Sequence, residues 1–571
     1  MKITGAQILL EMLKLYDVKH VFGLPGETTL ALYKYWAKFP EVKHILTHDE
    51  RSAAYMAEAY AKVTGRVGVS EAPSPGASHP APGVLESFTG SVPTVLLTSD
   101  VPYNCDKKNM LSGFDQNKLY SSITKESLLV TRAKDIPYII RRAFRVALSD
   151  RPGAVHVKIP MDVYMEETEV CDLYSDPRGI TWPAYRPVAD FDQIVKASEL
   201  LATAKSPVIV CGQGALVSGA GEAVLRVAEA LQIPVGCTMT AKGTISETHP
   251  LSIRLIGARG GTSYSNQFLK EADLVFFVGS NTDSAGTDAW QLPCCKNVPK
   301  VIQLDISGIE AGNNYPLEVC LVGDAKATME CIVDYIDKNN VKGCADNAKK
   351  IGPAMKSLDD SLVDHIKSNQ HPIHPVRLVK TVEKFLPNNS YVVVEAGVGS
   401  IFSAAYITQK IPGRKFVSNY SQGALGYTIP ACAAIAVAHP DALVVGMAGD
   451  GSFHFSCGEL ETYCRLGLNV KLFLFNNNVF GWIKGETAHV YQADFFATDF
   501  GVVDYAGVAK AFGIKSYKLN DPDKIEETIT EAFEYKGPVL IEVRVPDESE
   551  LVPPVPRWIN NAKKKGLPYC Y

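Results

Sequence analysis

Short runs of β-branched residues alternate with helix-forming segments along the whole chain of 571 residues. This alternation is typical of parallel sheets covered by helices, because two parallel strands need a long crossover connection that a helix provides. A chain of this length is also too long for a single hydrophobic core. The sequence therefore predicts an α/β protein built from several consecutive domains.

Two polar stretches with little apolar periodicity, at about 163–190 and 341–373, separate three α/β segments. Such stretches typically connect domains. We therefore expect domains over 1–165, 188–345 and 370–550, followed by a C-terminal tail over 551–571.

The composition argues against several classes of protein. A net charge of −5 at pH 7 gives no indication of nucleic-acid binding. No segment approaches the roughly 18 consecutive apolar residues of a membrane helix, and the N-terminal segment lacks the pattern of a signal peptide. The 13 cysteines include no C-x-x-C pair, which argues against a metal or disulfide framework. We expect a cytoplasmic protein that binds neither nucleic acid nor membranes.

The second segment opens with the strand VIVC and the glycine pair Gly212-x-Gly214, which leads into a helix. Alone, this pair is a weak indication of dinucleotide binding. A tight strand-to-helix turn is an equally good interpretation, so both alternatives stay open.

Polar residues follow two neighbouring strands of the third segment. One strand leads into Asp450 and the next into Asn477, with a helix between them whose start carries the capping-box pattern Ser456-x-x-Glu459. In a right-handed strand–helix–strand unit, Asp450 and Asn477 should emerge at the same sheet edge. Carboxylate and amide oxygens suit Mg²⁺, and the glycines beside Asp450 allow backbone N–H groups to approach a diphosphate. The alternative interpretation is two ordinary turns.

The stretch GDGSFHF…FNNN resembles the thiamin diphosphate motif, which begins with GDG and ends with NN after a helix and a strand. The resemblance implies Mg²⁺ ligation by the side chains of Asp450 and Asn477 and by the carbonyl of Val479. It also implies cofactor contacts by Gly451, Ser452, Phe480 and Gly481.

Other stretches resemble the same family. THDERSAAYMAEAYAKVTGRVGV is similar to the segment with the activating glutamate, which corresponds to Glu50. Such a carboxylate favours the imino tautomer of the aminopyrimidine, which then removes the C2 proton of the thiazolium. Without the resemblance, Glu50 would be interpreted as an acidic residue at a helix N-terminus. GALGYTIPA is similar to the cofactor-supporting segment, where Gly423 and Leu425 contact the cofactor, and Gly399 and Ser400 correspond to positions near the diphosphate.

These stretches cover nearly the whole chain, which resembles the acetolactate synthase, pyruvate oxidase and pyruvate decarboxylase superfamily. Acetolactate synthase-like proteins are most similar, through SPVIVCGQGA, ADLVFFVGS and NNYPLEVCLVGDAK. The resemblance implies the thiamin diphosphate-binding fold twice, in a pyrimidine domain and a diphosphate domain, with a Rossmann-like central domain between them. It also implies a homodimer or homotetramer in which Glu50 and Asp450 of one active site belong to different chains.

The reaction depends on side chains above the thiazolium ring. Glu27, in the loop GLPGE, corresponds to an acidic residue of pyruvate decarboxylases, although acetolactate synthases have a small residue there. An exposed loop carboxylate is the alternative interpretation of Glu27. His79, in SPGASHPAP, is a candidate substrate donor, with a structural loop histidine as the alternative.

A plain pyruvate decarboxylase is not indicated. The His-His pair of that enzyme is missing near Phe114 and Gln116, and Ile483, next to Trp482, stands at the place of its glutamate. These four residues are candidate substrate contacts.

We expect a 2-oxo acid decarboxylase or carboligase. A lyase of an acyl-coenzyme A thioester and a catalytically silent, cofactor-binding regulatory protein are the alternatives. The complete set of Glu50, Asp450 and Asn477 argues against the silent protein. FAD is expected to be absent, because Gly279-Ser280-Asn281-Thr282 replaces the region where flavin-binding relatives carry an arginine.

Overall fold

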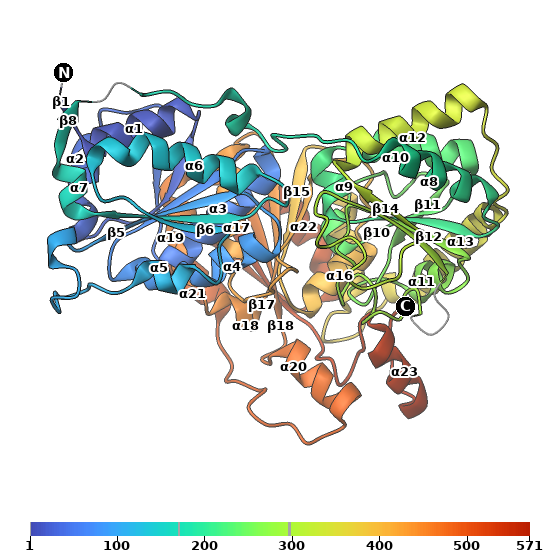
Figure 1. The fold of residues 1–571 in the computed structure, drawn as a ribbon. Coiled ribbons are helices and arrows are strands. Elements are labelled where there is room, and N and C mark those ends of the chain that lie inside the picture. The colour runs from blue at the N-terminus through green and yellow to red at the C-terminus, as the bar shows by residue number, and fades with distance from the viewer. Residues whose placement is uncertain (1, 170–171, 295–298) are drawn as a thin grey trace. The chain divides into compact units, whose positions relative to one another are not determined.

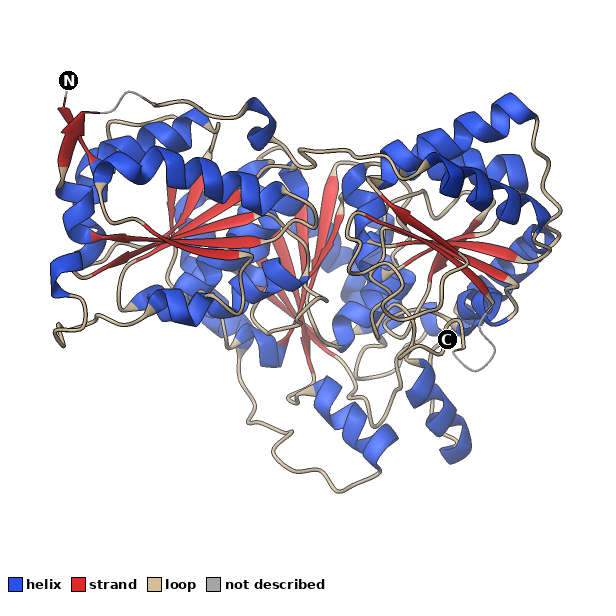
Figure 2. Cartoon of the chain, in the orientation of Figure 1, coloured by secondary structure: helices blue, strands red, loops and turns tan. Residues whose placement is uncertain are grey.

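The computed structural model describes residues 2–169, 172–294 and 299–571. These residues form three six-stranded sheets and one two-stranded sheet (Figure 1). Helices flank each six-stranded sheet (Figure 2), which confirms the predicted α/β class with three parallel-sheet domains. Within the described part of the chain, no helix combines the length and apolar character needed to cross a bilayer. Two compact units comprise Met1–Tyr185, Asn419–Val444 and His454–Val470, and Arg186–Ser418, Val445–Phe453 and Lys471–Tyr571.

The first sheet has the strand order β3-β2-β4-β5-β7-β6, with neighbouring strands parallel. Every residue of β4, β5 and β7 is buried, because helices cover both faces of a parallel sheet. The stretch predicted as a linker contains β8 (Glu167–Glu169), which pairs antiparallel with β1 (Lys2–Thr4). The strands are β2 (His20–Gly23), β3 (Lys43–Leu46), β4 (Gly68–Ala72), β5 (Thr94–Asp100), β6 (Glu126–Leu129) and β7 (Ala154–Pro160). The helices are α1 (Gly5–Leu15), α2 (Leu30–Trp36), α3 (Glu50–Thr64), α4 (Ala81–Thr89), α5 (Gln116–Tyr120), α6 (Ile136–Leu148) and α7 (Met161–Met165).

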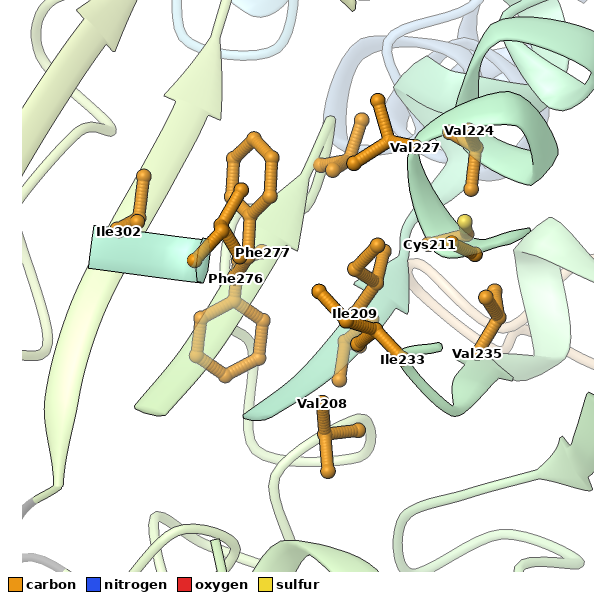
Figure 3. Packing of buried hydrophobic residues seen from close by; sticks show 14 of the residues in the cluster. Val208, Ile209, Cys211, Val224, Val227, Ile233, Val235, Phe276, Phe277 and Ile302 are labelled. Atoms are coloured by element: carbon orange, nitrogen blue, oxygen red, sulfur yellow. The ribbon is translucent and has the colours of Figure 1, made fainter. Parts of the chain in front are cut away.

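The central sheet has the order β11-β10-β9-β12-β13-β14 and contains the core shown in Figure 3. Phe276 and Phe277 point to opposite faces of β12, as the two-residue period of a strand requires, and both are fully buried. The strands are β9 (Pro207–Cys211), β10 (Val235–Cys237), β11 (Ser252–Leu255), β12 (Leu274–Val278), β13 (Lys300–Asp305) and β14 (Val319–Val322). The helices are α8 (Phe191–Thr203), α9 (Gln213–Ser218), α10 (Gly221–Leu231), α11 (Ser263–Lys270) and α12 (Ala325–Asn339).

The third sheet has the order β16-β15-β17-β18-β20-β19, so β17 and β18 are neighbours. Its strands are β15 (Ser390–Val394), β16 (Phe416–Ser418), β17 (Leu443–Gly449), β18 (Val470–Asn476), β19 (Lys515–Leu519) and β20 (Val539–Arg544). The helices after Ile373 are α15 (Pro375–Phe385), α16 (Val398–Tyr406), α17 (Thr428–Ala438), α18 (Asp450–Phe453), α19 (Leu460–Leu466), α20 (Gly481–Glu486), α21 (Tyr505–Ala511), α22 (Ile525–Glu534) and α23 (Pro556–Lys565).

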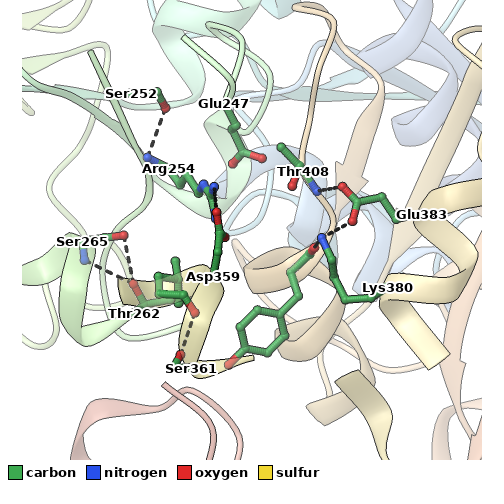
Figure 4. Close-up of polar contacts among 12 residues, drawn as sticks. Glu247, Ser252, Arg254, Thr262, Ser265, Asp359, Ser361, Lys380, Glu383 and Thr408 are labelled. Atoms are coloured by element: carbon green, nitrogen blue, oxygen red, sulfur yellow. Dashed lines mark hydrogen bonds and ion pairs between the residues drawn. The ribbon is translucent and has the colours of Figure 1, made fainter. Parts of the chain in front are cut away.

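The polar stretch 341–373 is structured. It contains α13 (Ile351–Ser361) and α14 (Val363–Ile366), and Leu358 of α13 is buried. Arg254 of β11 donates to both carboxylate oxygens of Asp359 at 2.7 and 3.1 Å (Figure 4). Bidentate geometry of this kind fixes α13 against the central domain.

The glycine pair Gly212-x-Gly214 packs against the loop after β12. Gly214 N–H donates to the carbonyl of Gly279 at 2.8 Å, and a Cβ added to Gly212 would overlap that carbonyl. The close approach of two backbones therefore accounts for both glycines.

Phe276→Ala should lower the free energy of unfolding of the central domain by about 3–5 kcal/mol, because the lost ring leaves a cavity in a packed core. Denaturant titration followed by circular dichroism measures this change. Ile309→Ala is the control, because Ile309 is 88% exposed and its loss should cost within about 0.5 kcal/mol. Equal costs for the two variants would contradict this account of the core.

Candidate active site

Asp450 and Asn477 meet at the carboxyl edge of the third sheet. One carboxylate oxygen of Asp450 accepts hydrogen bonds from the backbone N–H groups of Asn477 (3.0 Å) and Asn478 (2.6 Å). The other oxygen accepts from Gly451 N–H at 2.8 Å. The side chain that follows β17 is therefore bonded to the backbone that follows β18, and the ends of these two strands form one site.

The donor atoms at this edge fit a hard divalent cation. Asp450 is 2% exposed, and burial raises the pKa of its carboxyl group to about 6, although the three backbone N–H groups and the charge of Arg544 oppose this shift. Among the described residues, no Lys or Arg forms an ion pair with Asp450. A bound cation would compensate this buried charge further, and Asn477, whose amide oxygen accepts from Val479 N–H at 3.3 Å, could supply a second hard donor.

A second buried carboxylate, Glu548, lies at the same site, and the sequence analysis does not single it out. Its oxygens lie 3.3 and 3.4 Å from the side-chain nitrogen of Asn477. Burial, followed by the charges of Asp547 and Asp450, raises the pKa of Glu548 to about 8. Glu548 follows β20, which neighbours β18. Because the carboxyl ends of parallel strands lie at one sheet edge, the position of Glu548 after a strand could have indicated its place at the site.

The other residues implied by the motif lie around this edge. The ring of Phe480 packs against Gly451, and a Cβ added to Gly481 would overlap the carboxylate of Glu548. Ser452 is buried, and Val479 is buried in an isolated bridge to Asp499.

Gly399 and Ser400 lie in the first turn of α16, after β15. The Ser400 hydroxyl hydrogen-bonds the backbone of Glu395, accepting from its N–H at 3.0 Å and donating to its carbonyl. Gly399 packs against the ring of Phe475. Ser400 therefore stabilises the turn between β15 and α16.

Glu50 opens α3 and is 6% exposed. One of its oxygens lies 2.9 Å from Nδ1 of His79, so the candidate substrate donor is a partner of the candidate activating carboxylate. A Cβ added to Gly76 would overlap the other oxygen. Gly76 is a second residue that the sequence analysis misses, because its importance depends on a neighbour 26 positions away.

Glu27 begins a short 3₁₀ turn after β2 and is exposed. Its neighbour Thr28 is buried, and the Thr28 hydroxyl contacts Ser74 N–H at 3.0 Å and the Ser99 hydroxyl at 2.5 Å. The loops after β2 and β4 are therefore hydrogen-bonded to each other and to the end of β5, at the edge where Glu50 begins its helix.

Gln116 begins α5 and is hydrogen-bonded to β5. It is fully buried; its amide donates to the carbonyl of Ser99 at 2.9 Å and accepts from Thr98 at 2.5 Å. Both ends of the amide are therefore hydrogen-bonded to β5, and the expected substrate contact by Gln116 stays a prediction. Phe114, two residues earlier, is half-buried.

Trp482 is also packed within the protein. Its ring lies 4.5 Å from the ring of Trp558, and the Arg259 guanidinium lies 3.6 Å from its centre. Trp558 is fully buried in α23, so the segment expected as a tail is part of the folded structure. Ile483, in contrast, is 54% exposed.

The predicted capping box is not formed. The Ser456 side chain makes no capping hydrogen bond, and Glu459 instead accepts from the backbone N–H of His48 at 2.8 Å and from Thr462 at 2.7 Å. Glu459 therefore bonds His48, which is distant in the sequence, and not the backbone of Ser456.

Three family models match the chain in order: thiamine pyrophosphate enzyme, N-terminal TPP binding domain (3–119), central domain (194–332) and C-terminal TPP binding domain (395–543). The first match contains Glu50 and the last contains Asp450 and Asn477.

Full-length relatives agree with these matches. A probable acetolactate synthase large subunit of Methanococcus aeolicus is 31% identical, over 98% of this chain and 95% of the relative. The acetolactate synthase of Arthrospira platensis is 30% identical, over 99% and 98% of the two chains. A probable acetolactate synthase large subunit of Methanocaldococcus jannaschii is 30% identical, over 97% and 94%. The chain belongs to the thiamine pyrophosphate enzyme family and is one of its acetolactate synthase-like members.

Proposed function

We propose that this enzyme binds thiamin diphosphate through Mg²⁺ at the Asp450–Asn477 edge and decarboxylates or carboligates a 2-oxo acid. The observation that carries the proposal is the Asp450 carboxylate, buried between two strand ends without an ion-pair partner among the described residues. Asp450, the amide oxygen of Asn477 and the carbonyl of Val479 would hold the cation. Thiamin diphosphate, when bound, stabilises a carbanion next to a carbonyl carbon.

The chain's own residues then have distinct tasks. Glu50, buried next to Gly76 and His79, would hold the proton on the aminopyrimidine nitrogen. Gly423 and Leu425 would support the cofactor, and the residues around Gly451 would contact its diphosphate. We also propose that the enzyme is a homodimer or homotetramer whose active sites combine Glu50 and Asp450 from different chains, as in the family that it resembles.

Asp450→Ala should abolish retention of thiamin diphosphate, because the diphosphate would lose the cation that connects it to the sheet edge. Equilibrium dialysis with Mg²⁺ measures binding. Asp337→Ala is the control, since Asp337 pairs with Arg226 on the surface at 2.8 Å. Unchanged cofactor affinity in Asp450→Ala would refute the ligand assignment.

Glu50→Gln keeps the shape of the side chain and removes its charge. Cofactor binding should survive, whereas exchange of the C2 proton should slow by about a hundredfold or more, the usual effect of losing an acid–base group. NMR of the bound cofactor in D₂O measures the exchange rate. Equal rates in the two proteins would show that Glu50 does not activate the cofactor.

The substrate class is tested by incubation with pyruvate and longer 2-oxo acids and identification of products by mass spectrometry.

We propose that Glu27 delivers a proton to the decarboxylated product, so Glu27→Gln should slow product formation without changing C2 exchange. Identical products and turnover in Glu27→Gln would leave Glu27 as a loop carboxylate. Turnover of an acyl-coenzyme A thioester in place of 2-oxo acids would instead support the lyase alternative.

We also propose that the enzyme works without flavin. The loop Gly279-Ser280-Asn281-Thr282 contains no cation, and its polar groups bond within the protein. Gln303 donates to the Ser280 carbonyl at 2.9 Å and Asn314 donates to the Thr282 hydroxyl at 3.0 Å.

A further inference from the structure

The carboxylate of Glu86 binds the loop that leads to Gly423 and Leu425. Glu86 lies on α4 and is fully buried. One of its oxygens accepts from Ser421 N–H at 3.1 Å, and the other accepts from Gln422 N–H at 2.9 Å and Gly423 N–H at 3.0 Å. Three consecutive backbone N–H groups thus donate to a single carboxylate. That carboxylate belongs to a helix more than 300 positions earlier in the chain.

The loop has few other ways to satisfy these donors. Ser421 and Gln422 have exposed side chains, yet their N–H groups face the buried Glu86. Gly423 has a φ of +77°, a left-handed conformation that favours glycine. Asn419 donates to the carbonyl of Ala424 at 2.7 Å, so the loop is held from both ends of its turn.

The charges around Glu86 come from α3. Lys62 and Glu58 of α3 form a buried ion pair at 2.5 Å, and the hydroxyl of Tyr427, which precedes α17, donates to Glu58 at 2.7 Å. Burial raises the pKa of Glu86 to about 7, while Lys62 lowers it and Glu58 raises it. The anionic form of Glu86 accepts all three N–H groups, whereas the protonated form presents an O–H to one of them.

We propose that Glu86 is a positioning residue for the cofactor: its carboxylate fixes the backbone of residues 421–423 and thereby sets the place of Leu425. This inference rests on the proposed binding of thiamin diphosphate. Charge-assisted hydrogen bonds to backbone N–H groups are strong and directional, so they order a loop that has exposed side chains. A neutral amide offers one acceptor and turns an N–H₂ group toward the remaining donors.

Glu86→Gln should weaken binding of thiamin diphosphate, in the presence of Mg²⁺, by about tenfold, which corresponds to about 1.4 kcal/mol. Glu86→Asp keeps the charge and should retain more affinity than Glu86→Gln. The control is Glu126→Gln, which removes the same charge from β6 of the same unit, where it pairs with Arg142 at 2.9 Å. Titration of the apoprotein, followed by fluorescence, measures each dissociation constant.

Two further measurements separate positioning from a general loss of stability. Hydrogen exchange of the apoprotein should become faster in a peptide covering 419–425 in Glu86→Gln, with little change elsewhere. The ratio of the dissociation constants of Glu86→Gln and wild type should be large at pH 8 and approach one at pH 6, because wild-type Glu86 is then protonated. Taking the ratio cancels titration of the cofactor and of Asp450.

The outcomes are distinguishable. Wild-type affinity in Glu86→Gln, or a lower unfolding temperature with unchanged affinity and exchange, would overturn the positioning role while leaving the proposed function intact. Failure of the wild-type protein to bind thiamin diphosphate would overturn the proposed function, and the inference with it. Weakened binding with faster exchange at 419–425 and a pH-dependent ratio would support the inference.

Discussion

The hydrogen bonds of the Asp450 carboxylate hold together the ends of two parallel strands, and the candidate active site depends on them. Parallel strands deliver their carboxyl ends to one edge, but the loops that follow still have to be fixed. Asp450 does this by accepting the N–H groups of Asn477 and Asn478. The same contacts oppose the effect of burial on its pKa, and a cation would complete the compensation of its charge.

Glycine is required where carboxylates approach the backbone closely. The Glu50 carboxylate occupies the space that a side chain at position 76 would need, and the Glu548 carboxylate does the same at position 481. In both places the missing Cβ allows a buried charge to lie against the main chain. Some glycines, such as Gly451, are neighbours of a candidate site residue in the sequence. Others, such as Gly76 and Gly481, contact a buried carboxylate only in the folded chain.

The candidate substrate residues differ in how deeply the fold buries them. Glu27 is exposed, and its neighbour Thr28 hydrogen-bonds Ser74 after β4 and Ser99 of β5. The ring of Trp482 contacts Trp558 and the Arg259 guanidinium, whereas its neighbour Ile483 is exposed. Of these candidates, Glu27 and Ile483 are exposed, whereas Gln116 of α5 is buried against β5.

The sequence alone determined the fold class and the pair Asp450 and Asn477. Alternating strands and helices indicate parallel sheets, and a strand–helix–strand unit is almost always right-handed. Residues that follow its two strands therefore lie at the same sheet edge, as Asp450 and Asn477 do. The tertiary structure decided what depends on contacts between distant segments. Glu459 bonds His48 in place of a local cap, Gln116 is occupied by Thr98 and Ser99, and α23 packs Trp558 against Trp482. Gly76, Glu86 and Glu548 likewise acquire their importance only in the folded chain, because a buried carboxylate takes its partners from whichever backbone the fold brings to it.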